Sequence, residues 1–219
     1  MRQRKPKDLE ARLQTYSDQM INEPEGEGWK EHFSGERPLF LEIGCGKGQF
    51  ICSKALKEPG SDFIAVEGQD TVILRALEKA CEAGKQQYGA DMLPNLRFIM
   101  SYIDDMSDFF AENSLDGIYL NFSDPWPKAR HAKRRLTYRK RLEDYRKAVK
   151  PGGFIEIKTD NDGLYEFTLE EIEACGLVIE QQTRDLHGSS FDSRLTTTEY
   201  EDRFRGRDKN INYVRLRIE

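Results

Sequence analysis

Residues 39–50 read LFLEIGCGKGQF, and this run decides the fold class of the chain. An apolar strand breaks into a turn with three glycines, and a helical pattern begins directly after it. Glycine adopts positive φ without steric cost and lets the backbone approach a ligand, while the first turn of a helix presents free N–H groups. The run therefore predicts a nucleotide-binding turn at Gly44, Gly46 and Gly48.

A second apolar strand, residues 62–67, ends in an acid, Glu67. An acid about 20 residues after such a turn holds the ribose hydroxyls of a bound dinucleotide. Glu67 is therefore a candidate ribose ligand. The dinucleotide fingerprint also needs a glycine at the sixth place of the turn. Gln49 stands there, which weakens the interpretation as a nicotinamide or flavin site.

Apolar strand patterns alternate with helical patterns along most of the chain. Strands are predicted at 39–43, 62–67, 95–100, 115–121 and 153–158, and helices at 48–57, 70–84, 104–111, 138–148 and 162–174. Parallel strands need crossover connections, so this alternation indicates a parallel sheet with helices on both faces. Two more strands, 177–184 and 210–218, follow without a convincing helix between them. The predicted fold class is α/β: a doubly wound, seven-stranded, mostly parallel sheet whose last strand is antiparallel.

The length of 219 residues suits one well-buried domain. We expect residues 36–219 to form it, after a polar and partly mobile N-terminal extension, residues 1–35. No apolar run approaches the ~18 residues that a membrane span needs, so we expect a cytoplasmic protein with no membrane partner. The four cysteines show neither C-x-x-C spacing nor clustering with histidine, which argues against a metal site and a disulfide framework.

Basic residues are concentrated in one part of the chain. The net charge is −5, yet residues 128–150 contain eleven Lys or Arg against two acids. We call this stretch the basic segment. A solvated helix face usually mixes charge signs, so the segment indicates a large anionic partner bound through its phosphates. The side chains suited to phosphate are those of Arg130, Lys133, Arg134, Arg135, Arg139 and Arg141.

Polar residues gather where the predicted strands end. Ligands of doubly wound sheets bind outside the carboxyl ends of the strands, where the strand order reverses. The residues expected at this edge are Glu42, Glu67, Ser101–Asp105, Asn121–Trp126 and Lys158–Asp160. We therefore expect a single crevice to collect them.

Residues 121–136 read NFSDPWPKARHAKRRL, and this long motif is highly specific. It resembles the signature of the bacterial tRNA (guanine-N7-)-methyltransferases. The glycine turn, with Glu42 two residues before it, likewise resembles motif I of class I S-adenosylmethionine-dependent methyltransferases. The resemblance continues through FIEIKTDN at 154–161, DLH at 185–187 and TEYEDRF at 198–204, and it covers roughly residues 36–218.

The resemblance implies a Rossmann-like methyltransferase sheet, S-adenosylmethionine as cofactor and tRNA as partner. It implies that the methyl group goes to N7 of a guanosine in the tRNA variable loop. Matching positions place Glu42, Glu67 and Asp124 at the cofactor. They place Lys128, Asp160, Thr198, Glu199, Tyr200 and Glu201 at the tRNA. Gly44, Gly46 and Gly48 complete the expected cofactor site.

One position departs from the family pattern. After the third strand the family usually carries Asn-x-Asp-Ala, whereas residues 100–103 here read MSYI. Tyr102 thus replaces the expected carboxylate. The contact with adenine could come from backbone groups, from the Tyr102 hydroxyl, or from Asp104.

The chemistry of guanine N7 fits these residues. Its in-plane lone pair is free at neutral pH, so no base has to remove a proton, and catalysis consists of orientation and charge compensation. Asp124 and Asp160 are the candidate catalytic residues, with Asp160 on the guanine side and Asp124 on the cofactor side.

Three alternatives remain open on sequence alone. The chain could methylate another RNA base, act as a small-molecule oxidoreductase on the same sheet, or bind RNA without catalysis. The missing sixth-place glycine and the basic segment disfavour the oxidoreductase, and the intact acids disfavour the noncatalytic binder. The sequence leaves open the oligomeric state and the choice of tRNAs.

Overall fold

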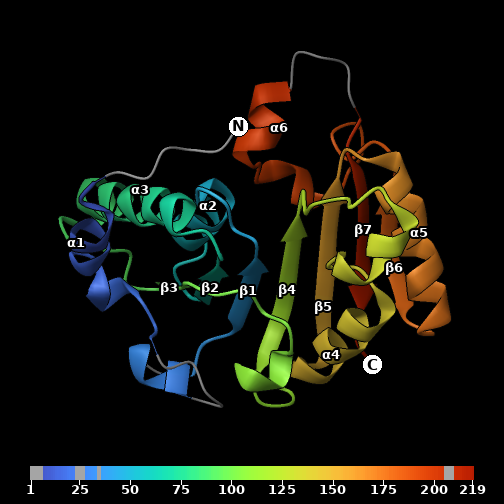
Figure 1. Ribbon diagram of the computed structural model, residues 1–219, viewed down its shortest axis with the longest axis horizontal. Helices are drawn as coiled ribbons and strands as arrows, with labels where there is room; N and C mark the ends of the chain where they lie inside the picture. The colour runs from blue at the N-terminus through green and yellow to red at the C-terminus, as the bar shows by residue number, and fades with distance from the viewer. Residues whose placement is uncertain (1–6, 23–27, 34–35, 205–209) are drawn as a thin grey trace.

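The computed structural model describes residues 7–22, 28–33, 36–204 and 210–219. Their centre is a sheet with the strand order β3-β2-β1-β4-β5-β7-β6 (Figure 1). The strands are β1 (Leu39–Ile43), β2 (Asp62–Val66), β3 (Leu96–Ile99), β4 (Leu115–Asn121), β5 (Val149–Thr159), β6 (Val178–Thr183) and β7 (Asn212–Arg217). The helices are α1 (Leu9–Gln14), α2 (Gln49–Lys57), α3 (Asp70–Tyr88), α4 (Arg139–Ala148), α5 (Asp162–Ala174) and α6 (Glu199–Phe204).

The strand pairing confirms the predicted fold class. β1 pairs in parallel with β2 and β4, and β2–β3 and β4–β5 are also parallel. β7 runs antiparallel to both β5 and β6. The order reverses between β1 and β4, so the ligand-binding edge lies at the carboxyl ends of these two strands.

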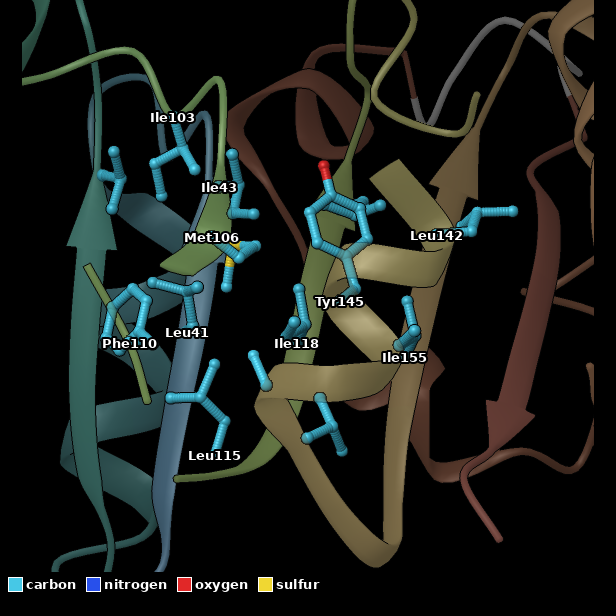
Figure 2. Close-up of a cluster of buried hydrophobic side chains, with 14 of the residues drawn as sticks. Leu41, Ile43, Ile103, Met106, Phe110, Leu115, Ile118, Leu142, Tyr145 and Ile155 are labelled. Carbon is cyan, nitrogen blue, oxygen red and sulfur yellow. The ribbon is translucent and has the colours of Figure 1, made fainter. Parts of the chain in front are cut away.

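Alternating side chains of each strand face two apolar layers. Figure 2 shows Leu41, Ile118 and Ile155, from three neighbouring strands, in a layer with Leu142 and Tyr145 of α4. Each buried side chain of this size stabilises the fold by about 1.5–3 kcal/mol. The opposite layer packs Phe63 and Ala65 against α2 and α3. Both faces of the sheet are therefore covered by packed apolar side chains, which fixes the strands whose carboxyl ends carry the predicted site.

Several element boundaries differ from the predicted ones. α3 continues four residues past the predicted end at Gly84. This glycine does not end the helix but allows close packing, because a Cβ there would meet the Met92 backbone at 2.6 Å. The helix ends instead at Gly89, in the left-handed conformation with φ 64°. The helix predicted at 104–111 is a short 3-10 turn, Met106–Asp108. β5 begins at Val149 rather than 153, with an irregular register opposite Leu115.

The described part of the N-terminal extension packs against the domain. α1 contacts α3, and Arg12 forms an ion pair with Glu78. The Ile21 N–H then donates to the Phe98 carbonyl at 2.8 Å, alongside β3. Residues 1–6, 23–27 and 34–35 lie outside the described residues, and the division at residue 35 stays a prediction. Among the described residues, no helix is both long and apolar enough to cross a membrane.

Candidate active site

Glu42 is a deeply buried acid at the carboxyl edge of the sheet. The sequence suggested that it follows the first strand, but it lies within β1, and 1% of its surface is exposed. Its Oε1 accepts a hydrogen bond from Asn121 Nδ2 at 2.8 Å, whereas its buried Oε2 has no partner among the described residues. Burial raises the pKa of Glu42 to about 8, partly offset by the Asn121 hydrogen bond and the charge of Lys158.

The three glycines of the turn serve two different purposes. Gly44, Gly46 and Gly48 all have positive φ, at 77°, 57° and 77°. A Cβ on Gly44 or Gly46 would meet nothing within 4 Å, so these two residues border open space. A Cβ on Gly48 would meet Ala76 Cβ at 2.8 Å, so Gly48 allows close contact with α3. Gly48 also caps α2.

Glu67 closes the glycine turn. Its Oε2 accepts from the Gly46 N–H at 3.1 Å, and its Oε1 accepts from the Gln69 N–H at 2.9 Å. Burial raises the pKa of Glu67, which the backbone donors partly offset and the charge of Asp124 reinforces. The negative charges of Glu67 and Asp124 therefore repel each other at this edge of the sheet. Asp124 is exposed in the loop after β4.

The loop 121–128 has an unusual backbone and is fixed by one arginine. Phe122 and Trp126 have positive φ, at 50° and 39°, which non-glycine residues seldom adopt and which clusters at functional sites. The Arg135 guanidinium donates to the carbonyl oxygens of Pro125 and Trp126, both at 3.0 Å. Arg135, expected to contact tRNA phosphate, thus uses its donors to hold this loop, whereas Arg134 stacks over the Trp126 ring at 4.9 Å.

The structure separates the two side-chain alternatives after β3. Tyr102 is 69% exposed, and its ring lies against Gly68, where a Cβ would meet the ring at 2.3 Å. It therefore stands beside Glu67. Asp104 instead forms an ion pair with Arg141, at 3.2 Å. Tyr102 thus lies beside Glu67, a residue expected at the cofactor, and Asp104 pairs with Arg141 of α4.

α6, which the sequence analysis missed, brings a second group of predicted residues to the same place. Its first turn is a capping box: the Thr198 N–H donates to Glu201 Oε2 at 2.8 Å, and the Glu201 N–H donates to Thr198 Oγ1 at 3.1 Å. The T-x-x-E spacing was a readable signal for this helix. The Glu201 side chain is fully buried, so its predicted contact with tRNA does not fit this structure.

Asp160 joins the α6 residues at the mouth of the crevice. The Tyr200 hydroxyl donates to Asp160 Oδ2 at 2.8 Å, and the Tyr200 ring packs on Phe122 with 4.8 Å between centroids. Glu199 pairs with Lys47 of the glycine turn at 3.6 Å and with Lys79 of α3 at 2.6 Å. These cross-links, which the sequence analysis did not foresee, tie α6 to the cofactor side.

One cavity of about 330 Å³ joins the two groups. It is lined by Glu42, Gly44, Cys45, Gly46, Lys47, Gln49, Phe50, Val72, Asn121, Phe122, Thr198, Glu199 and Tyr200. Of the residues expected in one crevice, Glu42, Asn121 and Phe122 line this cavity, opposite Thr198, Glu199 and Tyr200. The others, Glu67, Ser101–Asp105, Asp124 and Lys158–Asp160, are not among its lining residues. The described residues contain no cluster of three or more His, Cys, Asp or Glu side chains suited to a metal ion.

Some cations of the basic segment pair with groups of the protein itself, and others are exposed. Arg139 forms an ion pair with Glu171 at 2.8 Å, and Arg141 binds the Ile103 carbonyl as well as Asp104. These two arginines, expected at phosphates, hold α4 to its neighbours. Lys128, Arg130, Lys133 and Arg134 are exposed before α4, and Lys140, Arg146 and Lys147 are exposed on α4 itself.

The doubly wound sheet, the glycine turn at its switch point and the acid at the end of β2 define a class I methyltransferase. Solved structures agree on the fold. The 16S rRNA methyltransferase KamB has a TM-score of 0.60 at 10% identity, over 86% of this chain and 90% of that one. An antibiotic-related methyltransferase has a TM-score of 0.58 at 14% identity, over 87% and 92%.

Sequence comparison identifies the family. A family described as "Putative methyltransferase" matches residues 36–214. A tRNA (guanine-N(7)-)-methyltransferase of Latilactobacillus sakei subsp. sakei (strain 23K) is 42% identical over 196 residues, which is 89% of this chain and 88% of that protein. The chain belongs to the tRNA (guanine-N7-)-methyltransferase family.

Proposed function

We propose that this protein transfers a methyl group from S-adenosylmethionine to N7 of a guanosine in the variable loop of tRNA, in the cytoplasm. The observation that carries the proposal is the single cavity in which the glycine turn faces Thr198, Glu199 and Tyr200. Methyl transfer needs donor and acceptor in one water-poor space, aligned for direct displacement. Exposed cations on the basic segment supply a surface for the phosphates of a large substrate.

The cavity suits the family's cofactor. Gly44 and Gly46 leave open space on their cavity side, and the unpartnered Oε2 of Glu42 offers a buried acceptor for a cationic ligand. Glu67, Tyr102 and Asp124 stand around the same turn and would complete the binding site. When bound, S-adenosylmethionine supplies an electrophilic methyl group on a positively charged sulfur.

The residues on the substrate side can orient a guanine without removing a proton from it. Asp160 would accept from guanine N1–H or the exocyclic amine and offset the positive charge that methylation creates, while the Tyr200 hydroxyl fixes the carboxylate. Cys45 lines the cavity, but burial raises the pKa of its thiol well above its usual range. It therefore stays protonated and is no nucleophile. The positively charged Lys128 lies exposed after the loop, where it would contact the tRNA backbone.

Labelled methyl transfer tests this function. The purified protein, S-adenosylmethionine with a radioactive methyl group and unmodified tRNA should yield labelled 7-methylguanosine after digestion to nucleosides. Asp160→Asn should lower the rate and leave cofactor binding intact. Label in another nucleoside would assign the enzyme to a different RNA base. Retained cofactor with no labelled nucleoside would favour a noncatalytic RNA-binding protein.

A further inference from the structure

Lys158 is a fully buried lysine that the reaction described above does not use. It belongs to β5, two residues before Asp160, and none of its side chain is exposed. Its Nζ donates to the carbonyl oxygens of Ser193 at 2.7 Å and Thr196 at 2.9 Å. The ammonium also lies 5.2 Å from the centroid of the Phe50 ring, in the wall of the cavity.

Burying an ammonium costs several kcal/mol unless charges and hydrogen bonds compensate it. The main compensating charge is Glu201, whose side chain is also fully buried and whose Oε1 lies 3.9 Å from Nζ. Burial lowers the pKa of Lys158, and the carboxylates of Glu201, Glu156 and Glu42 oppose that change. Apolar residues would fill this space at less cost, so the charge calls for a role beyond packing.

The two hydrogen-bond acceptors of Lys158 and its ion-pair partner all belong to one stretch of chain, residues 193–201, which we call the anchored segment. Its carbonyls at Ser193 and Thr196 accept from the ammonium, and its carboxylate at Glu201 closes the capping box of α6. The same segment presents Glu199 and Tyr200 to the cavity. In Figure 1, α6 lies beyond the arrowhead of β4, without a strand pairing to hold it.

β5 therefore carries both halves of one contact. Asp160 follows directly after β5, and its partner Tyr200 lies on the anchored segment that Lys158 holds to the strand. Asp160 and the attachment point of the anchored segment both lie on β5. A small shift of that segment would therefore misplace Tyr200 relative to Asp160. A misplacement of the order of 1 Å can cost about 100-fold in rate.

We propose that Lys158 is a positioning residue for methyl transfer: its buried ammonium docks residues 193–201 onto β5 and so fixes Tyr200 and Glu199 over the cavity in register with Asp160. The proposal rests on the proposed function for its effect on rate. Its structural part, the docking of the segment, stands independently.

The test is Lys158→Met, which keeps the length of the side chain and removes the charge. The control is Lys85→Met on α3, outside the basic segment, where the ammonium pairs with Asp91 at 3.1 Å. Both variants are assayed well below their melting temperatures. For Lys158→Met, we expect amide hydrogen exchange in residues 196–202 to accelerate at least tenfold while β4 and β5 stay protected. We also expect the single-turnover rate at saturating cofactor and tRNA to fall at least tenfold. Lys85→Met should change neither.

A second variant keeps the test valid if Lys158→Met does not fold. Lys158→Met combined with Glu201→Gln removes both buried charges, which should recover folding, but it leaves the carbonyls of Ser193 and Thr196 without their donor. We expect fast exchange in the segment and a low rate in this variant also. Wild-type protection and wild-type rate in either folded variant would overturn the proposal.

The unaltered protein gives a further, independent readout. Its amides in residues 198–202 should exchange as slowly as those of β5 if the segment is docked through Lys158, whereas exchange within seconds would overturn the docking. Failure of the wild-type protein to methylate tRNA would instead contradict the proposed function, and the exchange comparison would still decide whether Lys158 docks the segment.

Discussion

At the scale of single residues, Glu42 concentrates the electrostatics of the site. Its carboxyl group is buried and hydrogen-bonded through one oxygen, while the other oxygen is buried without a partner among the described residues. Burial raises its pKa to about 8, so the unliganded protein holds it mainly protonated at neutral pH. A cationic ligand in the cavity favours the charged carboxylate. Binding of the cofactor and ionisation of Glu42 are therefore linked.

This linkage predicts a proton released on cofactor binding. Calorimetry at pH 7 in buffers of different ionisation enthalpy should detect the release, and affinity should rise with pH up to about pH 8 and then level off. Glu42→Gln should bind more weakly and abolish both effects. Equal proton release by wild type and Glu42→Gln would contradict the assignment.

The raised pKa also predicts how stability depends on pH. The unfolded protein ionises Glu42 near its ordinary pKa, whereas the folded protein does so near 8, so the folded state binds more protons between these values. The contribution of Glu42 to stability is therefore complete at acid pH and is lost as pH rises through about 8. Urea titrations of the unliganded protein should show Glu42→Gln gaining stability relative to wild type across this window. A stability difference between Glu42→Gln and wild type that does not change with pH would refute this prediction.

Gly46 should control cofactor binding through its backbone. Its φ of 57° strains any β-branched residue, and its N–H donates to Glu67. Gly46→Val should weaken S-adenosylmethionine binding at least tenfold, because strain of about 1–3 kcal/mol and a branched side chain disturb the turn. Asp160→Ala, on the substrate side, should leave the affinity nearly unchanged. Equal affinities of wild type and Gly46→Val in calorimetry would exclude this site.

At the scale of elements, strong local signals were predictable and weak ones were not. The β1–turn–α2 unit follows from an apolar run, three glycines and a helical pattern, and the structure confirms it within about a residue. α6 was missed although Thr198 and Glu201 form a capping box, because the six-residue helix is acidic and shows little apolar periodicity. α3 was cut short at Gly84 because the close approach of Met92 is a tertiary contact that no local pattern reveals.

The basic segment should separate into two kinds of arginine. Arg134 is exposed, so Arg134→Ala should weaken tRNA binding and lower the slope of log affinity against log salt by about one unit, with cofactor affinity unchanged. Arg135 holds the Pro125 and Trp126 carbonyls, so Arg135→Ala should lower the free energy of unfolding by about 1–3 kcal/mol. Titrations of tRNA binding at several salt concentrations, with thermal melts, check both. An unchanged slope in Arg134→Ala would make that side chain a solvated one.

At the scale of the whole molecule, the location of the site was predictable and the side-chain contacts within it were not. Strand order alone places the crevice at the carboxyl ends of β1 and β4, and two of the predicted acids, Glu42 and Glu199, line the cavity there. The pairing of Glu199 with Lys47 and Lys79, and the burial of Glu201 on Lys158, join segments more than 40 residues apart. Spacing carries no information on such contacts. The family resemblance places Glu201 at the tRNA, whereas its side chain is buried here as the cap of α6.

The central claim is that the molecule orients N7 of guanine and removes no proton from it. A single-turnover pH profile, with cofactor and tRNA both saturating, tests this most directly. The rate should be nearly flat from neutral to mildly alkaline pH and fall only in acid, where carboxylates near the site take up protons. A rate that climbs tenfold per pH unit across the neutral range would show that a proton must be lost first, and N7 would then be the wrong acceptor.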